Sequence, residues 1–287
     1  MTTPVNAVDS GTFRWYVHPI TGERFMSVTA ALSHVAKFEL PRWAATLSAK
    51  AAIDAWARLR DAAAIEPCGR KGDNGCGKCR ACVTEWLSNR HNVVRDTASD
   101  IGSRFHQAVE HYTVFGPGGY VDADVRPFFN AYLAWAERAK PKLRAAEVTV
   151  INRKYGYAGT LDAVMFFGVK SELPKQLKHL KRRSVLVDYK TGKSVGAPAA
   201  WQLAAYRAAE HVLMPDGTEV KLPRIGAGMV LHVRPESEGG VAMREAHLDT
   251  RAFSRFIHAL RIAEAMGSPL GESLSRPQRF TAPKEAK

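Results

Sequence analysis

Residues 157–190 of this 287-residue chain read YAGTLDAVMFFGVKSELPKQLKHLKRRSVLVDYK, with two apolar runs that each carry a carboxylate. Asp162 lies in the first run, and Asp188 lies near the end of the second with Lys190 two residues later. Residues i and i+2 of a β-strand face the same side, so Asp188 and Lys190 are expected to point together while Tyr189 points away. Two carboxylates beside an ammonium group can hold a divalent cation and position a water molecule against a phosphate. The stretch therefore predicts two strands of a sheet and favours hydrolysis of phosphodiester bonds.

The bulk composition is that of an ordinary globular chain, with 46% hydrophobic and 24% charged residues. No apolar run approaches the ~20 residues that a membrane-spanning helix needs. Residues 1–9 lack both the basic and the apolar region of a secretory signal. We therefore expect an intracellular, cytoplasmic protein with no membrane partner.

The chain is strongly basic, with 41 lysine and arginine residues against 28 acidic ones and a formal charge of +13. Such an excess favours a polyanionic partner, of which nucleic acid is the commonest, although a merely basic soluble surface would give the same count. Much of the excess falls between the two predicted strands. We expect five residues there to bind a DNA backbone beside the carboxylates: Lys175, Lys178, Lys181, Arg182 and Arg183.

Hydrophobic periodicity predicts helices in the first part of the chain and a sheet in the second. A strand pair is expected over residues 11–30, with Ser27 capping a helix that begins near Thr29. Helices are expected over residues 41–64, 84–112 (with a break near Gly102), 125–139, 199–214 and 253–266. Strands are expected over residues 146–151, 155–167, 184–189, 224–233 and 241–248.

This order of elements predicts an α/β fold. We expect residues 1–100 to form an N-terminal hairpin and helical region with a cysteine-bearing metal module at about residues 66–84. A catalytic core with a mixed central sheet flanked by helices follows over residues 101–267, and residues 268–287 form a flexible tail.

Four short motifs follow one another within about a hundred residues. They are Gly102-Ser103-Arg104-Phe105-His106, Gly159-Thr160-Leu161-Asp162, Asp188-Tyr189-Lys190-Thr191-Gly192 and Gln202-Leu203-Ala204-Ala205-Tyr206. In this order the set resembles the PD-(D/E)XK nuclease superfamily, and within it the RecB-like exonucleases, including CRISPR-associated and phage-encoded members. The resemblance covers roughly residues 102–206.

The resemblance implies a site for Mg²⁺ or Mn²⁺. His106 on a helix, the carboxylates of Asp162 and Asp188, and the main-chain carbonyl of Tyr189 are the implied ligands. Glu147 on the preceding strand resembles an additional acidic residue of some members. Independently of the resemblance, carboxylate oxygens suit Mg²⁺ and Mn²⁺, and a histidine tilts the preference towards Mn²⁺.

The resemblance also implies catalytic roles for the two carboxylates and for the residues that follow them. Lys190 would orient or help deprotonate the attacking water and stabilise charge on the phosphate. Gln202 and Tyr206, one helical turn apart, would face the site and contact Lys190 or the DNA. Three of the motifs also have a purely structural explanation. His106 could be a packed or surface histidine, Asp188 and Lys190 could be an edge-strand ion pair, and Gln202 and Tyr206 could be the polar edge of a helix.

The four cysteines, Cys68, Cys76, Cys79 and Cys82, follow the spacing C-x7-C-x2-C-x2-C and account for every cysteine of the chain. Four thiols within 15 residues of an intracellular basic protein indicate a metal site rather than disulfides. Both Zn²⁺ and a [4Fe–4S] cluster fit the sequence. Two C-x2-C knuckles are a common zinc pattern but here share Cys79, and three cysteines spaced by two with a distant fourth also fit a cubane.

The resemblance therefore implies a metal-dependent DNA nuclease, in the exonuclease branch, used in recombination or repair. A single-strand annealing protein or a helicase is the implied partner, and a phage-encoded member would act in the host cytoplasm. The alternative is a non-catalytic nucleic-acid-binding protein built around the cysteine module, and a third reading is a partner-recruiting subunit. Strand polarity, single- or double-stranded substrate and oligomeric state stay open.

Overall fold

The two strands predicted from residues 157–190 lie at the centre of the sheet. In this computed structural model, which describes residues 6–10, 13–35 and 39–267, β5 spans Tyr157–Phe167 and β6 spans Ser184–Lys190. The two strands are antiparallel. β6 runs parallel to β9 (Ala227–Val233), which is buried along its whole length. Burial on both faces explains why β6 and β9 are almost continuously apolar.

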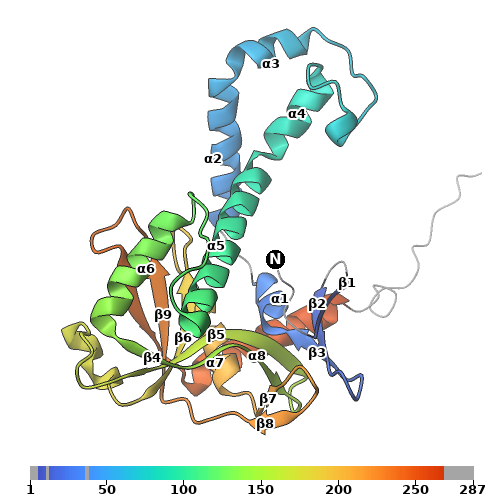
Figure 1. Ribbon diagram of the computed structural model, residues 1–287. Helices are drawn as coiled ribbons and strands as arrows, with labels where there is room; N and C mark the ends of the chain where they lie inside the picture. The colour runs from blue at the N-terminus through green and yellow to red at the C-terminus, as the bar shows by residue number, and fades with distance from the viewer. Residues whose placement is uncertain (1–5, 11–12, 36–38, 268–287) are drawn as a thin grey trace, which may run out of the picture.

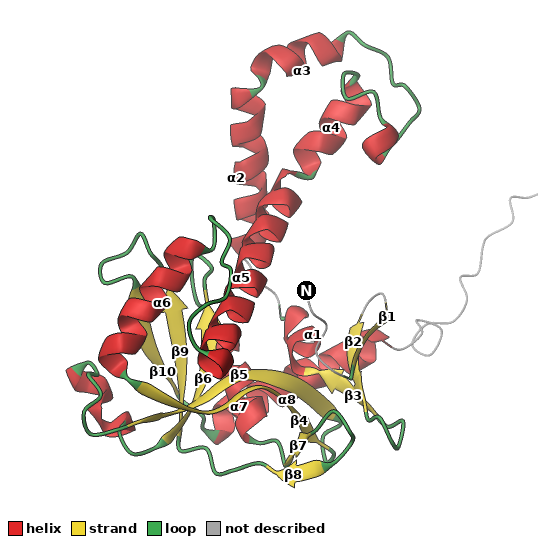
Figure 2. Ribbon diagram, viewed as in Figure 1, coloured by secondary structure: helices red, strands yellow, loops and turns green. Residues whose placement is uncertain are grey.

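The other strands complete one mixed, ten-stranded sheet (Figure 1). They are β1 Ala7–Ser10, β2 Phe13–Val17, β3 Arg24–Ser27, β4 Pro141–Asn152, β7 His211–Leu213, β8 Glu219–Lys221 and β10 Val241–Ala246. One path through the sheet runs β1-β2-β3-β5-β4-β7-β8, and β6, β9 and β10 continue from β5 in another direction. The sheet is curled and flanked by helices, so the fold is α/β as predicted (Figure 2).

One edge of β5 is shared between two strands that part from each other. At its start, β5 pairs with β3 in parallel through residues 157 and 158. Further along, β5 pairs with β6 through residues 163–166. Residues 159–162 lie between the two ladders, and this fork in the sheet includes Asp162.

Helices cover both faces of the sheet. α6 (Arg126–Ala139) and the C-terminal half of α5 (Arg90–Phe115) pack on one face, in a core that includes Phe105 and Tyr132. The opposite core includes Leu203 and Phe256, from α7 and α8 respectively. The helices on this side are α1 Val28–Ser33, α7 Pro198–Arg207 and α8 Thr250–Gly267.

A helical arm projects from the core (Figure 1). The arm comprises α2 (Glu39–Asp54), α3 (Trp56–Ala63), α4 (Arg80–Ser88) and the first part of α5, which continues into the core. The hydroxyl of Ser48 donates a hydrogen bond of 3.0 Å to the carbonyl of Leu87 between its two sides. All four cysteines lie at the end of the arm farthest from the sheet.

Three features of the predicted helices are wrong. The helix expected over residues 199–214 ends at Arg207, because residues 211–213 pair with β4 as β7. The helix does not break at Gly102. α5 is continuous there, and a Cβ on Gly102 would lie 3.2 Å from the hydroxyl of Thr191, so this glycine allows close packing. The breaks fall instead between α2 and α3 and between α4 and α5.

The amino-terminal hairpin joins the same sheet as the central strands. β3 pairs with β5, and Ser27 caps α1 as predicted by accepting a hydrogen bond from the amide of Ala30. The division of the chain at residue 100 stays a prediction about folding units, and the predicted tail 268–287 lies outside the described residues. Among the described residues, no helix is both long and apolar enough to cross a bilayer.

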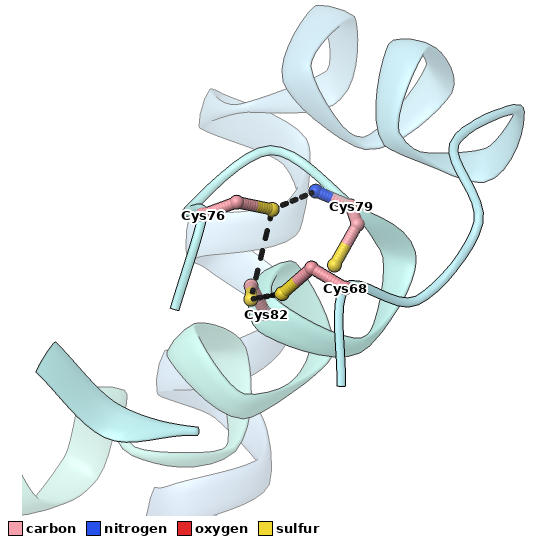
Figure 3. A group of neighbouring side chains, drawn as sticks. All are labelled: Cys68, Cys76, Cys79 and Cys82. Carbon is pink, nitrogen blue, oxygen red and sulfur yellow. Dashed lines mark hydrogen bonds between the residues drawn. The ribbon is translucent and has the colours of Figure 1, made fainter. Parts of the chain in front are cut away.

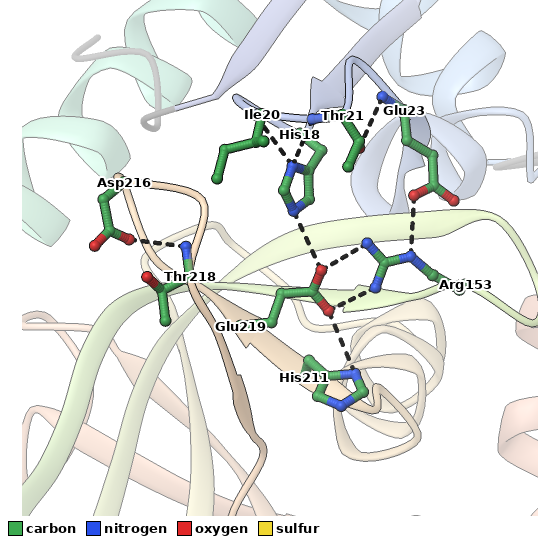
Figure 4. Close-up of polar contacts among 9 residues, drawn as sticks. All are labelled: His18, Ile20, Thr21, Glu23, Arg153, His211, Asp216, Thr218 and Glu219. Atoms are coloured by element: carbon green, nitrogen blue, oxygen red, sulfur yellow. Dashed lines mark hydrogen bonds and ion pairs between the residues drawn. The ribbon is translucent and has the colours of Figure 1, made fainter.

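A network of charged side chains joins the hairpin β2–β3 to the hairpin β7–β8 (Figure 4). Arg153, in the turn between β4 and β5, donates two hydrogen bonds of 2.5 and 2.6 Å to Glu219 and one of 3.0 Å to Glu23. The buried His18 accepts two backbone hydrogen bonds at Nδ1, so its Nε2 carries the proton and donates to Glu219 at 3.2 Å. Hydrogen bonds from Arg153 lower the pKa of Glu219. The network therefore stabilises the contact between the two hairpins when the carboxyl group of Glu219 is ionised.

Candidate functional site

The four sequence motifs meet at one cavity of about 500 Å³ beside the fork in the sheet. His106 reaches it from α5, Asp162 from β5, Lys190 from β6, and Gln202 and Tyr206 from α7. Tyr189 and Glu147 also line the cavity. Of the described residues predicted for catalysis and for Mg²⁺ or Mn²⁺, only Asp188 does not line it; its side chain is 2% exposed.

His106, Glu147 and Asp162 form the tightest group of metal-ligating side chains in this cavity. One ligand atom of each lies within 4.8 Å of the others. Nδ1 of His106 is 3.6 Å from Oδ2 of Asp162, and its Nε2 is 3.1 Å from the main-chain carbonyl of Tyr189. The same Oδ2 of Asp162 accepts a hydrogen bond of 2.7 Å from the amide of Tyr189. Two carboxylates and an imidazole at this spacing could hold one cation.

Glu147 reaches the cavity through an unusual backbone conformation. Its φ of 48° lies in the left-handed region, although it stands inside β4 between residues that pair regularly with β5. A residue with a side chain pays roughly 1–2 kcal/mol for this conformation. Burial, together with the charges of Asp162 and Glu110, raises the pKa of Glu147 to about 8. The protein thus holds a carboxyl group among other carboxylates, where a cation would stabilise its charge.

Asp188 and Lys190 point together as their spacing predicts. Nζ of Lys190 donates a hydrogen bond of 2.7 Å to Oδ1 of Asp188, whereas the buried Oδ2 of Asp188 has no partner among the described residues. Burial raises the pKa of Asp188 to about 6 against the opposing effect of Lys190. Burial lowers the pKa of Lys190, but Asp188 and Asp162 more than offset this, so its pKa is raised. Lys190 therefore carries a positive charge.

Gln202 and Tyr206 form the wall of the cavity on α7. The amide of Gln202 donates a hydrogen bond of 3.2 Å to the hydroxyl of Tyr206, whose ring is 2% exposed. Burial raises the pKa of Tyr206 well above its usual value, so the hydroxyl is neutral. The ring packs against Gly159, where a Cβ would lie 2.6 Å from Cε1 of Tyr206. The glycine of the second motif is thus required by the tyrosine of the fourth.

Three residues that line the cavity, Arg14, Tyr16 and Glu110, were missed in the sequence. Arg14 and Tyr16 come from β2, and the hydroxyl of Tyr16 is 3.0 Å from that of Thr160. Glu110 lies one turn after His106 on α5. The i, i+4 rule would have found Glu110 from the position of His106. Nothing in the sequence shows that β2 reaches the fork.

The five basic residues predicted to bind DNA lie at the other end of the central strands. Lys175, Lys178, Lys181, Arg182 and Arg183 belong to the connection between β5 and β6, which contains a short 3₁₀ helix over Lys175–Leu180. Five strand residues, about 17 Å, separate Asp162 from the end of β5. None of the five lines the cavity, so the expectation that they lie beside the carboxylates is wrong. Their binding to DNA stays a prediction.

The four cysteines come together at the tip of the arm (Figure 3). Their sulfur atoms all lie within 4.8 Å of one another, and none forms a disulfide. Sγ of Cys82 is 3.6 Å from that of Cys68 and 3.9 Å from that of Cys76. Backbone hydrogen bonds lower the pKa of Cys68 to about 6, which favours the thiolate that binds metals. The group could hold a metal ion such as Zn²⁺.

The comparisons with known proteins add no assignment to these two sites. The chain matches no protein-family model, and no curated protein matches its sequence.

Proposed function

We propose that the chain is a divalent-metal-dependent DNA nuclease with a PD-(D/E)XK active site, acting as an exonuclease. The observation that carries this proposal is the convergence of four motifs from α5, β5, β6 and α7 on one cavity. A carboxylate pair or a histidine alone has many structural explanations. A structural role for each motif separately gives no reason for their meeting beside a positively charged lysine.

The residues present fit a divalent cation such as Mg²⁺ or Mn²⁺. Oδ2 of Asp188 is buried and has no partner within the described part of the chain, and the cavity gathers the carboxylates of Glu147, Asp162 and Glu110. A buried, unpartnered carboxylate oxygen is costly unless a cation or a donor compensates it. His106, Asp162 and Glu147 would hold the cation, with Asp188 next to them. It would supply Lewis-acid polarisation of the phosphate and lower the pKa of water.

The remaining side chains would align the substrate and the attacking water. The ammonium of Lys190, held by Asp188 at 2.7 Å, would approach the non-bridging phosphate oxygens, on which negative charge grows in the transition state. Because Lys190 is charged, it would stabilise charge rather than accept a proton. Gln202 is held by the fixed hydroxyl of Tyr206 and would donate to the phosphate or to the adjacent sugar. Attack on phosphorus from a water aligned with the leaving oxygen would leave a 5′-phosphate and a 3′-hydroxyl.

The proposal is tested with end-labelled linear DNA and covalently closed circular DNA, each with Mg²⁺, Mn²⁺ or EDTA. Loss of the linear substrate alone, with metal and not with Asp188→Asn, would support the exonuclease and give its polarity. Nicking of the circle would keep the active site but replace exonuclease by endonuclease. Absence of cleavage by folded wild-type protein in both metals would contradict the proposal.

We further propose that the cysteine group binds one Zn²⁺ rather than a [4Fe–4S] cluster. With Zn–S bonds of about 2.3 Å in a tetrahedron, neighbouring sulfur atoms lie about 3.8 Å apart. The separations of 3.6 and 3.9 Å around Cys82 lie on either side of this value. In a cubane each thiolate binds a different iron atom, which spreads the four sulfur atoms farther apart.

The compact cysteine group also supports the second candidate, a nucleic-acid-binding protein without catalysis. That function predicts DNA binding that survives Asp188→Asn and is lost with Cys79→Ser, with no product under any metal. The same digestion and a binding assay on these two variants decide between the candidates.

A further inference from the structure

A second groove lies at the tip of the arm, far from the candidate active site. It encloses about 660 Å³ between the cysteine-bearing loop and α4. Three cationic residues, Arg70, Lys71 and Arg80, line it, and their side chains are exposed. No ion pair is found for them within the part of the chain that the structure describes. The one carboxylate in the groove, Glu85, accepts hydrogen bonds of 3.3 Å from the amide of Gly72.

The groove is built on a rigid base. The ring of Trp86 contacts two guanidinium groups, that of Arg58 at 4.6 Å and that of Arg90 at 5.2 Å from its centroid. Arg58 also donates a hydrogen bond of 2.8 Å to the carbonyl of Gly77 in the cysteine loop. These contacts join α3, the cysteine loop, α4 and α5. The bond from Arg58 to Gly77 therefore holds the cysteine loop, to which Arg70 and Lys71 belong, against α3.

The cations of the groove lie beyond the arm end of α5, so this helix gives the least distance between them and the candidate active site. α5 runs without a break from Arg90 at the arm to His106 at the cavity, 16 residues later. At about 1.5 Å per residue this is about 24 Å. Duplex DNA rises about 3.4 Å per base pair, so about 7 base pairs span it. A duplex keeps such a separation because its persistence length is about 150 base pairs.

We propose that the arm-tip groove binds the phosphate backbone of duplex DNA about 7 or more base pairs from the phosphate at the candidate active site. This inference rests on the proposed nuclease function, because it takes one end of the duplex to lie at the cavity. It makes the arm a second contact that short duplexes cannot reach. In this proposal the metal-bound cysteine group has a structural role, because it holds Arg70 and Lys71 in place.

The test measures binding without added Mg²⁺ or Mn²⁺, and without a chelator that would remove zinc, to a 6-base-pair hairpin, about 20 Å long, and to a 20-base-pair duplex. Wild-type protein is compared with Lys71→Glu/Arg80→Glu and with the matched double reversal Lys154→Glu/Lys221→Glu. The control residues are exposed and lie on the turn between β4 and β5 and on β8, away from the arm (Figure 1). Zinc content and circular dichroism check that all three proteins are folded.

The arm-tip variant is expected to lose at least tenfold in affinity for the long duplex and less than twofold for the hairpin. Its log–log salt slope on the long duplex should become shallower by about 2, because each lost phosphate contact removes about 0.9. The control should lose equally on both lengths. An unchanged affinity for the long duplex, an equal loss on both lengths, or a loss of zinc as the cause would overturn the inference. Because no catalytic metal is added, binding is measured without cleavage, and the proposed nuclease function fails separately, in the digestion assay.

Discussion

Gly159→Ala is expected to destabilise the protein through one contact. The new Cβ would lie 2.6 Å from Cε1, 3.1 Å from the hydroxyl and 3.2 Å from Cζ of Tyr206. The Tyr206 ring is 2% exposed and sits on α7 against the core, so it cannot swing aside. Overpacking of this kind costs about 1–3 kcal/mol. At about 2–4 °C per kcal/mol, the Tm should fall by about 2–12 °C.

Two controls separate this contact from a general cost of replacing glycine in β5. Gly168 follows β5 directly, and a Cβ there would meet nothing within 4 Å. Gly168→Ala should therefore be neutral or stabilise by about 0.4–1 kcal/mol. In a Tyr206→Leu background, which lacks all three contacting atoms, Gly159→Ala should cost less than about 0.5 kcal/mol. Denaturant titration of the four proteins of this cycle measures the coupling, and a coupling near zero would refute the reasoning.

Substitutions of Lys190, Cys79 and Glu219 test the candidate active site, the cysteine group and the charged network. Lys190→Met should reduce metal-dependent cleavage at least 100-fold in a gel assay while the protein stays folded, because the ammonium held by Asp188 is lost; full activity of this variant would contradict the mechanism. Cys79→Ser should lower the metal content measured by mass spectrometry from one zinc per chain to nearly none, whereas iron and sulfide in the wild type would contradict the zinc assignment. The lowered pKa of Glu219 contributes stability that is present above its usual value near 4.5 and is lost as the pH falls through the lower folded value. Glu219→Gln should therefore lower the free energy of unfolding at pH 7 by about 1–2 kcal/mol and flatten its fall below pH 4.5; parallel pH profiles would contradict this.

The parts of the fold that the sequence predicts are those with a local cause. The apolar runs of β5 and β6 predict buried strands, and a period of two places Asp188 and Lys190 on one side. Ser27 predicts a helix start through its own hydroxyl. The spacing of Gln202 and Tyr206 predicts that both face the cavity. In each case the cause lies within one turn or one strand.

The parts that the sequence does not predict depend on pairing across long distances in the chain. β7 is three residues long and exists because it pairs with β4, about sixty residues earlier. β2 contributes Tyr16 to the cavity only because the hairpin joins β5 from the far side of the fork. The basic connection 168–183 follows Asp162 closely in sequence, yet antiparallel pairing carries it to the opposite end of the strands. Sequence proximity to a motif is thus a poor guide to proximity in the sheet.

The fork in the sheet explains why the site lies where it does. Where two strands part along one edge of β5, the ladder ends and backbone amides need other acceptors. Asp162 meets this need, since its Oδ2 accepts from the amide of Tyr189 beyond the last pair of β5 and β6. The same oxygen faces His106 at 3.6 Å, so one carboxylate serves both the fold and the candidate metal site. Truncation of Asp162 would disturb both roles at once. Oδ2 of Asp188 has no partner among the described residues, so a substitution at Asp188 tests the candidate metal site more directly.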